Sequence, residues 1–363
     1  MTARTRADLA SLPAYVPGRT VVGAVKLASN EVPAGPLPSV VAAIAEAARG
    51  VNRYPDTAST ALAERLAREL DVPAERVVVG CGSVSLCQQL VQATCGEGDE
   101  VVFAWRSFEA YPIVTQVAGA TARRVPLRPD ATHDLPAMLA AITPSTRLVF
   151  VCNPNNPTGT AVRRAELSAF LDALPDGVLA VVDEAYTEFV TDPEVPDGVA
   201  LARGRDDVAV LRTFSKAYGL AGLRVGYCVA PEPVAAALSK VQVPFSVNAL
   251  AQTAAMASLN AADELLARCA GVAAERDRVR GELLALGYDV PESQTNFVWL
   301  PLGDRAGDFT RHCIDHKVVV RGFAGDGVRV TVGDPAEDDQ FLAAAAAYPH
   351  RRPERAVVDT TRR

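Results

Sequence analysis

Lysine is scarce in this chain of 363 residues, which has only Lys26, Lys216, Lys240 and Lys317, and arginine supplies the other strong cations. The formal net charge is −7, so the chain lacks the basic excess that would hold nucleic acid or an anionic membrane by electrostatic attraction. No apolar run reaches the roughly 18 residues of a spanning helix. The N-terminus also lacks an apolar signal core, and we therefore expect a cytoplasmic protein.

Cysteine and histidine are not arranged as metal ligands or disulfides. The seven cysteines are scattered without a Cys-x-x-Cys pair, which favours small buried apolar side chains. His312 and His316 have helical i, i+4 spacing, but no third ligand stands near them in the sequence. We therefore expect no metal site.

Between residues 39 and about 226, apolar helical segments alternate with short β-branched strands. The predicted helices are 39–49, 57–70, 83–95, 108–119 and 163–173, and the predicted strands are 77–80, 100–103, 147–151, 178–182, 208–211 and 224–229. This alternation, with nearly continuous apolar strands, is typical of an α/β fold in which helices cover a mostly parallel sheet.

The pattern changes after Pro244. An alanine-rich helical stretch at 249–286, broken near 260–263, precedes strands at 295–300, 318–321 and 327–332 and helices at 304–316 and 336–347. We predict an N-terminal arm at 1–38, a large domain at 39–245, a smaller α+β domain at 246–350 and a disordered tail at 351–363. The arm is expected to pack against the small domain or a partner subunit.

Most of the polar motifs stand where a predicted strand ends and a loop begins, and in open parallel sheets that edge is where ligands bind. The motifs are Ser29-Asn-Glu-Val-Pro33, Asn52-Arg-Tyr-Pro-Asp56, Gly80-Cys-Gly-Ser83, Asn153-Pro-Asn-Asn-Pro-Thr-Gly159, Val182-Asp-Glu-Ala-Tyr186, Leu211 to Gly226 around Lys216, and Gly327-Val-Arg-Val-Thr331. No single motif suffices; their common position is what predicts a site.

Lys216 follows an apolar strand and precedes a turn of small residues, with Arg224 eight positions on. A Schiff-base amine needs this setting, partly desolvated and beside a cation that lowers its pKa. Taken alone, the position is better explained as a surface lysine at a strand–loop junction.

Gly80-Cys-Gly-Ser83 follows a strand and opens a helix, where backbone N–H groups and the helix dipole hold phosphate. A tight turn is the simpler alternative. The dinucleotide motif Gly-x-Gly-x-x-Gly is a further alternative, although Ser85 stands where its last glycine belongs.

Three further positions suit a ring-shaped cofactor and its substrate. Asp183 ends an apolar strand, where a buried carboxylate calls for a cation such as a protonated pyridine nitrogen, although an Asp cap is common. Asn156 lies on a proline-stiffened loop and suits a phenolate oxygen, and a plain turn is its alternative. Arg329 in a late strand suits bidentate binding of a carboxylate or an internal ion pair.

Together these motifs resemble the fold-type-I pyridoxal-phosphate aminotransferases of class I/II, over about residues 12–347. Within them the chain is similar to the histidinol-phosphate aminotransferase subgroup. Tyr15-Val-Pro-Gly18, Gly35-Pro-Leu-Pro38, Gly80 to Gln89 and Trp105-Arg-Ser-Phe-Glu109 resemble the actinobacterial aromatic (phenylalanine) aminotransferases more closely.

The resemblance implies pyridoxal 5'-phosphate as cofactor, amino acid and 2-oxo acid substrates, and a homodimer with shared active sites. It implies a Schiff base at Lys216, which also moves the substrate proton, and Asp183 at the pyridine nitrogen. Cofactor binding would involve Tyr54 from the neighbouring subunit, Ser83, Val84, Phe108, Asn156, Tyr186, Ser215 and Arg224. Substrate binding would involve Tyr15, Asn30, Arg321 and Arg329. Phe108 departs from the tyrosine of many relatives, keeping a stacking face without the hydroxyl.

The resemblance favours an aromatic amino acid:2-oxoglutarate aminotransferase working by ping-pong transamination. Histidinol-phosphate aminotransferase stays open because Arg321 offers a cation for a substrate phosphate. An apolar pocket formed by Tyr15, Phe108, Tyr111 and Phe323 would instead favour aromatic substrates. A decarboxylase on the same fold and a non-catalytic cofactor-binding protein are the remaining alternatives.

Overall fold

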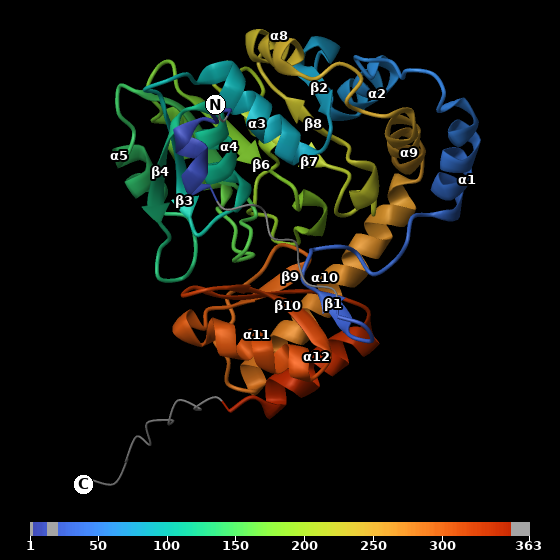
Figure 1. Ribbon diagram of the computed structural model, residues 1–363, viewed down its shortest axis with the longest axis vertical. Coiled ribbons are helices and arrows are strands. Elements are labelled where there is room, and N and C mark those ends of the chain that lie inside the picture. The colour runs from blue at the N-terminus through green and yellow to red at the C-terminus, as the bar shows by residue number, and fades with distance from the viewer. Residues whose placement is uncertain (1–2, 13–20, 350–363) are drawn as a thin grey trace.

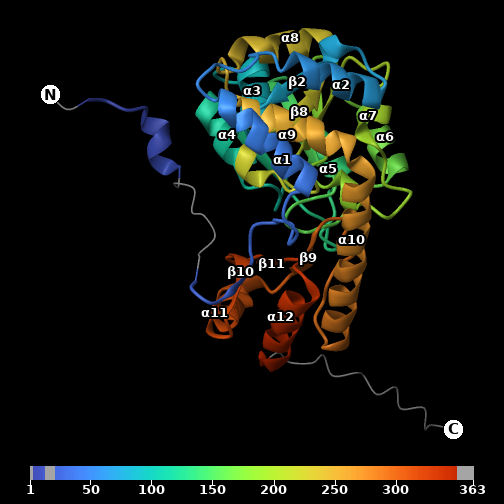
Figure 2. The same cartoon turned by 90° about the vertical axis from the view of Figure 1, so that its right-hand side faces the viewer.

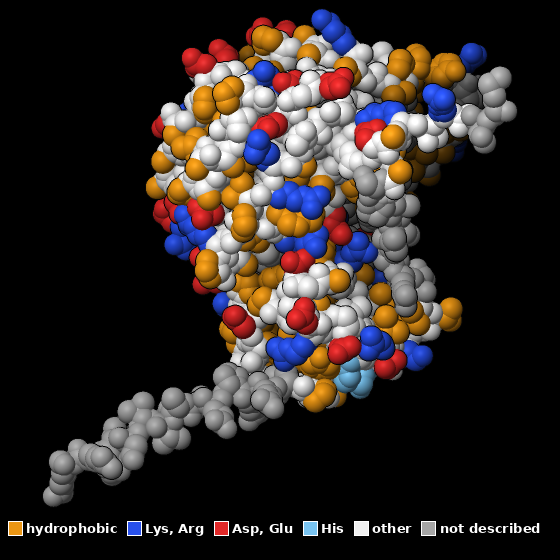
Figure 3. All heavy atoms as spheres, turned by 60° about the vertical axis from the view of Figure 1, so that its left-hand side comes forward, with side chains coloured by type: hydrophobic (Ala, Val, Ile, Leu, Met, Phe, Trp, Pro, Cys, Tyr) orange, Lys and Arg blue, Asp and Glu red, His pale blue; other side chains and the backbone are white. Residues whose placement is uncertain are grey.

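The computed structural model describes residues 3–12 and 21–349. In Figure 1 these residues form an upper body around one sheet and a lower body around another. Basic and acidic side chains are interspersed over the face shown in Figure 3. None of the helices that the structure describes is long and apolar enough to cross a membrane.

The upper body contains a seven-stranded sheet in the order β2-β8-β7-β6-β5-β3-β4. Its strands are β2 (Val77–Gly80), β3 (Glu100–Trp105), β4 (Thr121–Pro126), β5 (Thr146–Cys152), β6 (Leu179–Asp183), β7 (Val208–Thr213) and β8 (Gly226–Val229). All neighbours are parallel except β8, which runs antiparallel to β2 and β7. The predicted mostly parallel α/β sheet is therefore confirmed.

Helices cover both faces of this sheet because its strands are apolar on both sides. Along β3, Val102 and Ala104 face one core cluster, while Val101 and Phe103 face the other. The helices are α1 (Pro38–Ala47), α2 (Thr60–Leu70), α3 (Ser83–Thr94), α4 (Ala110–Ala118), α5 (Leu135–Ala140), α6 (Arg164–Asp172), α7 (Gly198–Leu201), α8 (Glu232–Val241) and α9 (Ala249–Asn260).

The long helix α10 (Ala262–Ala285) runs from the upper body into the lower one, as Figure 2 shows. The predicted break near 260–263 is confirmed, since α9 ends at Asn260 and Ala261 leaves helical geometry with φ −115° and ψ 29°. Because α9 packs against α1 within the upper core, residues just after 245 still belong to that core. The domain boundary near 245 stays a prediction.

The lower body holds a four-stranded sheet in the order β1-β10-β11-β9. It comprises β1 (Val25–Leu27), β9 (Phe297–Leu300), β10 (Val318–Phe323) and β11 (Gly327–Thr331), with helices α11 (Ala306–Asp315) and α12 (Pro335–Ala347). Strand β1 comes from the predicted N-terminal arm and pairs in parallel with β10. The arm therefore carries a strand of this sheet, which the proline-rich sequence did not predict.

Other elements were also absent from the prediction. Strand β4 is an exposed edge strand with the sequence TARRVP, so it lacks the apolar pattern of the central strands. Helices α5, α7 and α8 were not predicted either. Short 3-10 turns complete the chain at Ala7–Ser11, Ala48–Gly50, Ala74–Arg76, Thr187–Phe189, Ala221–Leu223 and Gly303–Arg305.

Candidate active site

A cavity of about 560 Å³ is lined by residues of both bodies, at the carboxyl ends of β5, β6 and β7. It brings together most of the residues that the sequence predicted. The lining includes Asn30, Ser83, Val84, Phe108, Asn156, Asp183, Tyr186, Ser215, Lys216, Arg224, Arg321 and Arg329. Tyr54 does not line this cavity, and Tyr15 lies outside the described residues.

Lys216 lies in the loop that follows β7, with its amine directed at the N-terminal segment. Its Nζ donates a hydrogen bond to the Ser29 carbonyl oxygen at 3.3 Å and lies 5.9 Å from the centre of the Tyr186 ring. Burial, followed by the positive charges of Arg329 and Arg224, lowers the pKa of Lys216 to about 7. A substantial fraction of the amine is therefore neutral and nucleophilic near neutral pH.

Asp183 ends β6 and is buried, with 2% of its surface exposed. Its Oδ2 accepts a hydrogen bond from the Tyr111 hydroxyl at 2.8 Å. Its Oδ1 has no hydrogen-bond partner among the described residues. Burial raises the pKa of Asp183 to about 6, against the lowering effect of the Tyr111 bond. A buried carboxylate oxygen in this state is ready to accept a bond from a cationic N–H donor.

Tyr186 and Asn156 lie on one side of the cavity and are linked to the lower body. The Asn30 Nδ2 donates to the Tyr186 hydroxyl at 2.8 Å, and Thr331 Oγ1 accepts from the Asn30 backbone N–H at 2.9 Å. Arg329 donates from Nη1 to Asn156 Oδ1 at 2.6 Å and from Nη2 to the Ala28 carbonyl at 2.8 Å. These bonds join the arm, β11 and the upper body around the cavity.

An anion cradle lies where α3 begins. Arg224 adopts a left-handed φ of 59° just before β8, and its Nη1 donates to Ser215 Oγ at 3.2 Å. A Cβ added at Gly82, whose φ is +77°, would lie 2.7 Å from Arg224 Nη2. The guanidinium therefore lies against the N-terminus of α3, where the helix dipole and N–H groups also attract an anion. The prediction that Arg224 begins a strand is wrong, since β8 starts at Gly226.

Two of the predicted site residues, Arg321 and Tyr54, have surroundings that differ from those of the other predicted site residues. Arg321 lies in β10 and forms an ion pair with Glu109, 3.0 Å between Nη2 and Oε2. Tyr54 is 82% exposed and stacks on Phe245 with ring centres 4.6 Å apart. An exposed stacked aromatic pair of this kind is typical of a surface that another protein covers.

The predicted apolar pocket is only partly present. Phe108 lines the cavity, but Tyr111 is fully buried beside Phe150 and Phe323 is buried beside Trp299. The prediction for Tyr111 is therefore wrong, because its hydroxyl is used to hold Asp183. Sequence reasoning missed this role of Tyr111 and that of Glu109. Their spacing from Asp183 and Arg321 carries no periodic signal.

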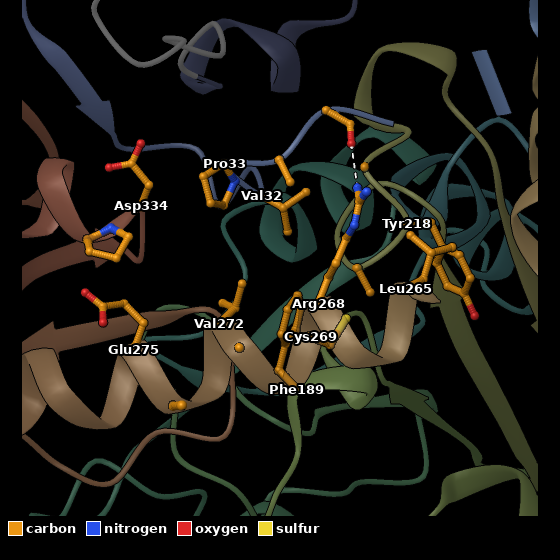
Figure 4. Close-up of a pocket in the computed structure, with 18 of the residues that line it drawn as sticks. Val32, Pro33, Phe189, Tyr218, Leu265, Arg268, Cys269, Val272, Glu275 and Asp334 are labelled. Carbon is orange, nitrogen blue, oxygen red and sulfur yellow. Dashed lines mark hydrogen bonds between the residues drawn. The ribbon is translucent and has the colours of Figure 1, made fainter. Parts of the chain in front are cut away.

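A second cavity of about 550 Å³ lies beyond the Lys216 loop, between the segment 32–35 and α10. Figure 4 shows its mostly apolar wall, with Val32 and Pro33 opposite Val272 and Cys269. Arg268 donates to the Gly35 carbonyl at 3.0 Å across this space. The bond ties the arm to the helix that joins the two bodies.

Residues 22–344 match the family model described as aminotransferase class I and II, and the chain belongs to this family. The family is pyridoxal-phosphate-dependent, and its members act on amino acid and keto acid substrates. The chain is therefore an aminotransferase, and the predicted class and cofactor are confirmed.

Individual relatives are similar over almost their whole length. The chain is 62% identical to "Aromatic amino acid aminotransferase" of Rhodococcus jostii, covering 96% of each chain. It is 58% identical to the protein of the same name from Streptomyces avermitilis, covering 95% of this chain and 97% of the relative. Among solved structures, histidinol-phosphate aminotransferase from Sinorhizobium meliloti in complex with pyridoxal-5'-phosphate is similar, with 30% identity, a TM-score of 0.86 and coverage of 95% and 97%.

The residues of the cavity fit this cofactor. Asp183 Oδ1 is a buried acceptor without a partner among the described residues, as a pyridine N–H would require. The α3 N-terminus with Arg224 forms an anion cradle that a side chain at Gly82 would fill. Lys216, partly desolvated, lies in the same cavity. The ring nitrogen, the phosphate and the carbonyl group of pyridoxal phosphate would therefore each meet a suitable partner in this cavity.

Proposed function

We propose that the chain is an aromatic amino acid:2-oxoglutarate aminotransferase that uses pyridoxal 5'-phosphate and works by ping-pong transamination. The names of its relatives at 58–62% identity support the aromatic substrate class. The observation that carries the proposal is the cavity that places Lys216, Asp183 and Arg329 together. Its nucleophile, its carboxylate and its guanidinium are the three groups that transamination requires.

In this proposal the cofactor would be held at both ends and along one edge. Ser83 and Val84, through backbone amides, would bind its phosphate with Ser215 and Arg224. Asp183 would accept from its ring nitrogen, while Asn156 and Tyr186 would bond its 3'-oxygen, and Phe108 would stack on its face. Bound there, pyridoxal phosphate supplies an electron sink for the carbanion formed at the substrate α-carbon.

Lys216 would move the substrate proton. Its amine, with a pKa near 7, is able to take a proton from the substrate α-carbon and to return one during the same half-reaction. Tyr111, through its 2.8 Å bond to Oδ2, would keep Asp183 oriented with Oδ1 toward the cavity. The chain thus supplies a base whose pKa lies near 7, a carboxylate held in one orientation by a hydrogen bond, and the cavity that contains both.

Arg329 would bind the substrate α-carboxylate. Its hydrogen bonds to Asn156 and to the Ala28 carbonyl orient the guanidinium toward the cavity. Asn30, hydrogen-bonded to Tyr186 and Thr331, would complete this end of the site. We also assign Tyr15 and Arg321 to substrate binding, as the resemblance implies.

We further propose a homodimer as the functional unit. The exposed pair of Tyr54 and Phe245 supports it, together with the neighbouring exposed Val243, which is 67% accessible. Tyr54 is far too exposed for a core tyrosine and does not line its own chain's cavity. In a dimer it would reach the phosphate in the partner's site.

Histidinol-phosphate aminotransferase is the second candidate function. Arg321, which lines the cavity, favours it because a guanidinium suits a substrate phosphate. The ion pair of Arg321 with Glu109 counts against it, since the carboxylate already balances that charge.

Turnover by the purified holoenzyme with 2-oxoglutarate tests the proposal. Phenylalanine and tyrosine are expected to give their 2-oxo acids, and histidinol phosphate little product. Lys216→Ala should be inactive while keeping its fold by circular dichroism. Turnover of histidinol phosphate alone would assign the second function, and carbon dioxide release from the amino acid would rule out transamination.

A further inference from the structure

We propose that Arg106 is a positioning residue for the reaction: its ion pair with Asp326 holds the β10–β11 hairpin against the upper body and so fixes where Arg329 meets the substrate. This role rests on the proposed function, in which Arg329 binds the substrate α-carboxylate. Neither Arg106 nor Asp326 lines the cavity that contains Lys216, so the pair would act through Arg329 and not by touching the substrate.

The ion pair joins the two bodies at the turn of the hairpin. Arg106 directly follows β3 in the upper body, and Asp326 lies in the turn between β10 and β11 in the lower body. Arg106 donates from Nε at 2.8 Å and from Nη2 at 2.5 Å to Asp326 Oδ2. The two side chains are 20% and 37% exposed, so water and salt screen this pair less than a fully exposed one.

Aromatic rings of both bodies also contact the Arg106 guanidinium. Its central carbon lies 4.4 Å from the centre of the Trp105 ring, in β3, and 5.5 Å from the centre of the Phe323 ring, at the end of β10. A guanidinium is attracted to aromatic rings at such distances. Arg106 therefore binds the hairpin at two points, through the Phe323 ring and through the Asp326 carboxylate.

The same hairpin carries Arg329. Asp326 precedes Arg329 by three residues, and β11 is hydrogen-bonded to β10 along one edge and to β9 along the other. Every residue of β11 is buried. A buried strand that is paired along both edges moves with its sheet, so a bond that holds Asp326 also sets the position of Arg329.

The backbone of Arg106 contacts the opposite side of the site. Its carbonyl oxygen accepts from Asn155 Nδ2 at 3.2 Å, and Asn155 Oδ1 accepts from Ser107 Oγ at 2.8 Å. Asn155 immediately precedes Asn156, whose Oδ1 accepts from Arg329 at 2.6 Å. Arg106 thus touches the loop that carries Asn156 through its backbone and the hairpin that carries Arg329 through its side chain.

Such a residue should affect substrate binding more than the chemical step. The α-carboxylate keeps its charge during proton transfer, so its contact with Arg329 is equally strong in the bound substrate and in the transition state. Weakening a uniform contact of this kind raises the substrate concentration for half-saturation and leaves the limiting rate nearly unchanged. Because all amino acid substrates share the α-carboxylate, the effect should not depend on the side chain.

The test is the single-turnover half-reaction of the holoenzyme, followed by cofactor absorbance in stopped flow, with phenylalanine and separately with glutamate. Asp326→Asn keeps the size of the side chain and removes its charge. It should raise the half-saturating concentration of both amino acids about tenfold and change the limiting rate less than about twofold. Arg106→Gln should have the same effect, and the double variant should be no worse than either single one, because the pair is already lost.

Asp339→Asn is the matched control. It makes the same chemical change and removes an ion pair of 2.9 Å with Arg278, which joins α12 to α10 and not the hairpin to the upper body. Both kinetic values should stay at the wild-type level. In an Arg329→Gln background, Asp326→Asn should change the ratio of limiting rate to half-saturating concentration less than about twofold, which ties its effect to that guanidinium.

Three results would each overturn the proposal: an unchanged half-saturating concentration in Asp326→Asn, an equal shift in Asp339→Asn, or additive effects in the double variant. Unchanged cofactor absorbance and melting temperature show that the variants are folded. Failure of the proposed function would appear separately, as a wild-type enzyme whose cofactor reacts with glutamate and not with phenylalanine.

Discussion

At the scale of single residues, Lys216 shows how position sets reactivity. An unperturbed lysine amine has a pKa of 10.5 and is almost wholly protonated at neutral pH, whereas burial together with Arg329 and Arg224 brings the pKa of Lys216 to about 7. Because the folded pKa is depressed, the amine is neutral above about pH 7 and protonated below it.

The rate at which cofactor-free protein takes up pyridoxal phosphate should therefore rise with pH through a midpoint near 7, since the neutral amine is the nucleophile. Below the midpoint we expect a loss of about tenfold per pH unit. Stopped-flow absorbance between pH 5.5 and 9 measures this rate. Arg329→Gln should move the midpoint upward, because a positive charge that lowers the pKa is removed. A midpoint above 9 in the wild type would contradict the assignment.

At the scale of elements, the end of β6 is fixed by a buried ion pair beside Asp183. Glu184 directly follows Asp183 and accepts from Arg212 Nε and Nη2 of β7 at 2.9 and 2.8 Å. Its other oxygen accepts from the backbone N–H of Gly198 at 2.6 Å, at the start of α7. Glu184 is 1% exposed, so water cannot replace Arg212.

Arg212→Met should lower the free energy of unfolding by about 3–5 kcal/mol, because it leaves the buried Glu184 carboxylate without its cation. Urea denaturation measures the loss. Adding Glu184→Gln to this variant should recover part of it, since the uncompensated charge is removed. A loss below about 1 kcal/mol for Arg212→Met would show that Glu184 is neutral in the fold or that water reaches it.

At the scale of the whole molecule, the two bodies and the proposed second subunit together complete the site. If Tyr54 serves the partner's cavity, a mixed dimer of Lys216→Ala and Tyr54→Ala chains contains one site with both changes and one with neither. Co-refolding the two variants should restore turnover well above that of either variant alone. Recovery no greater than the sum of the separate activities would show that each chain builds its own site.

The sequence by itself determined the alternation of helices and apolar strands, and with it the parallel sheet and the edge at which polar motifs gather. Strand period and turn chemistry are local, so the loops carrying Asn156 and Lys216 and the strand that ends at Asp183 were predictable. Strands β1 and β4 were not, because an arm strand and an exposed edge strand lack the apolar pattern.

Only the tertiary structure decided which side chains meet. Tyr111 and Asp183 are 72 residues apart, Asn30 and Tyr186 are 156 apart, and Glu109 and Arg321 are 212 apart. No periodicity links such pairs, since their contact depends on how Tyr111 of α4 packs against the upper sheet and on how the lower body meets the upper one. The sequence therefore specified the reacting groups, and packing specified the partners that tune their charge.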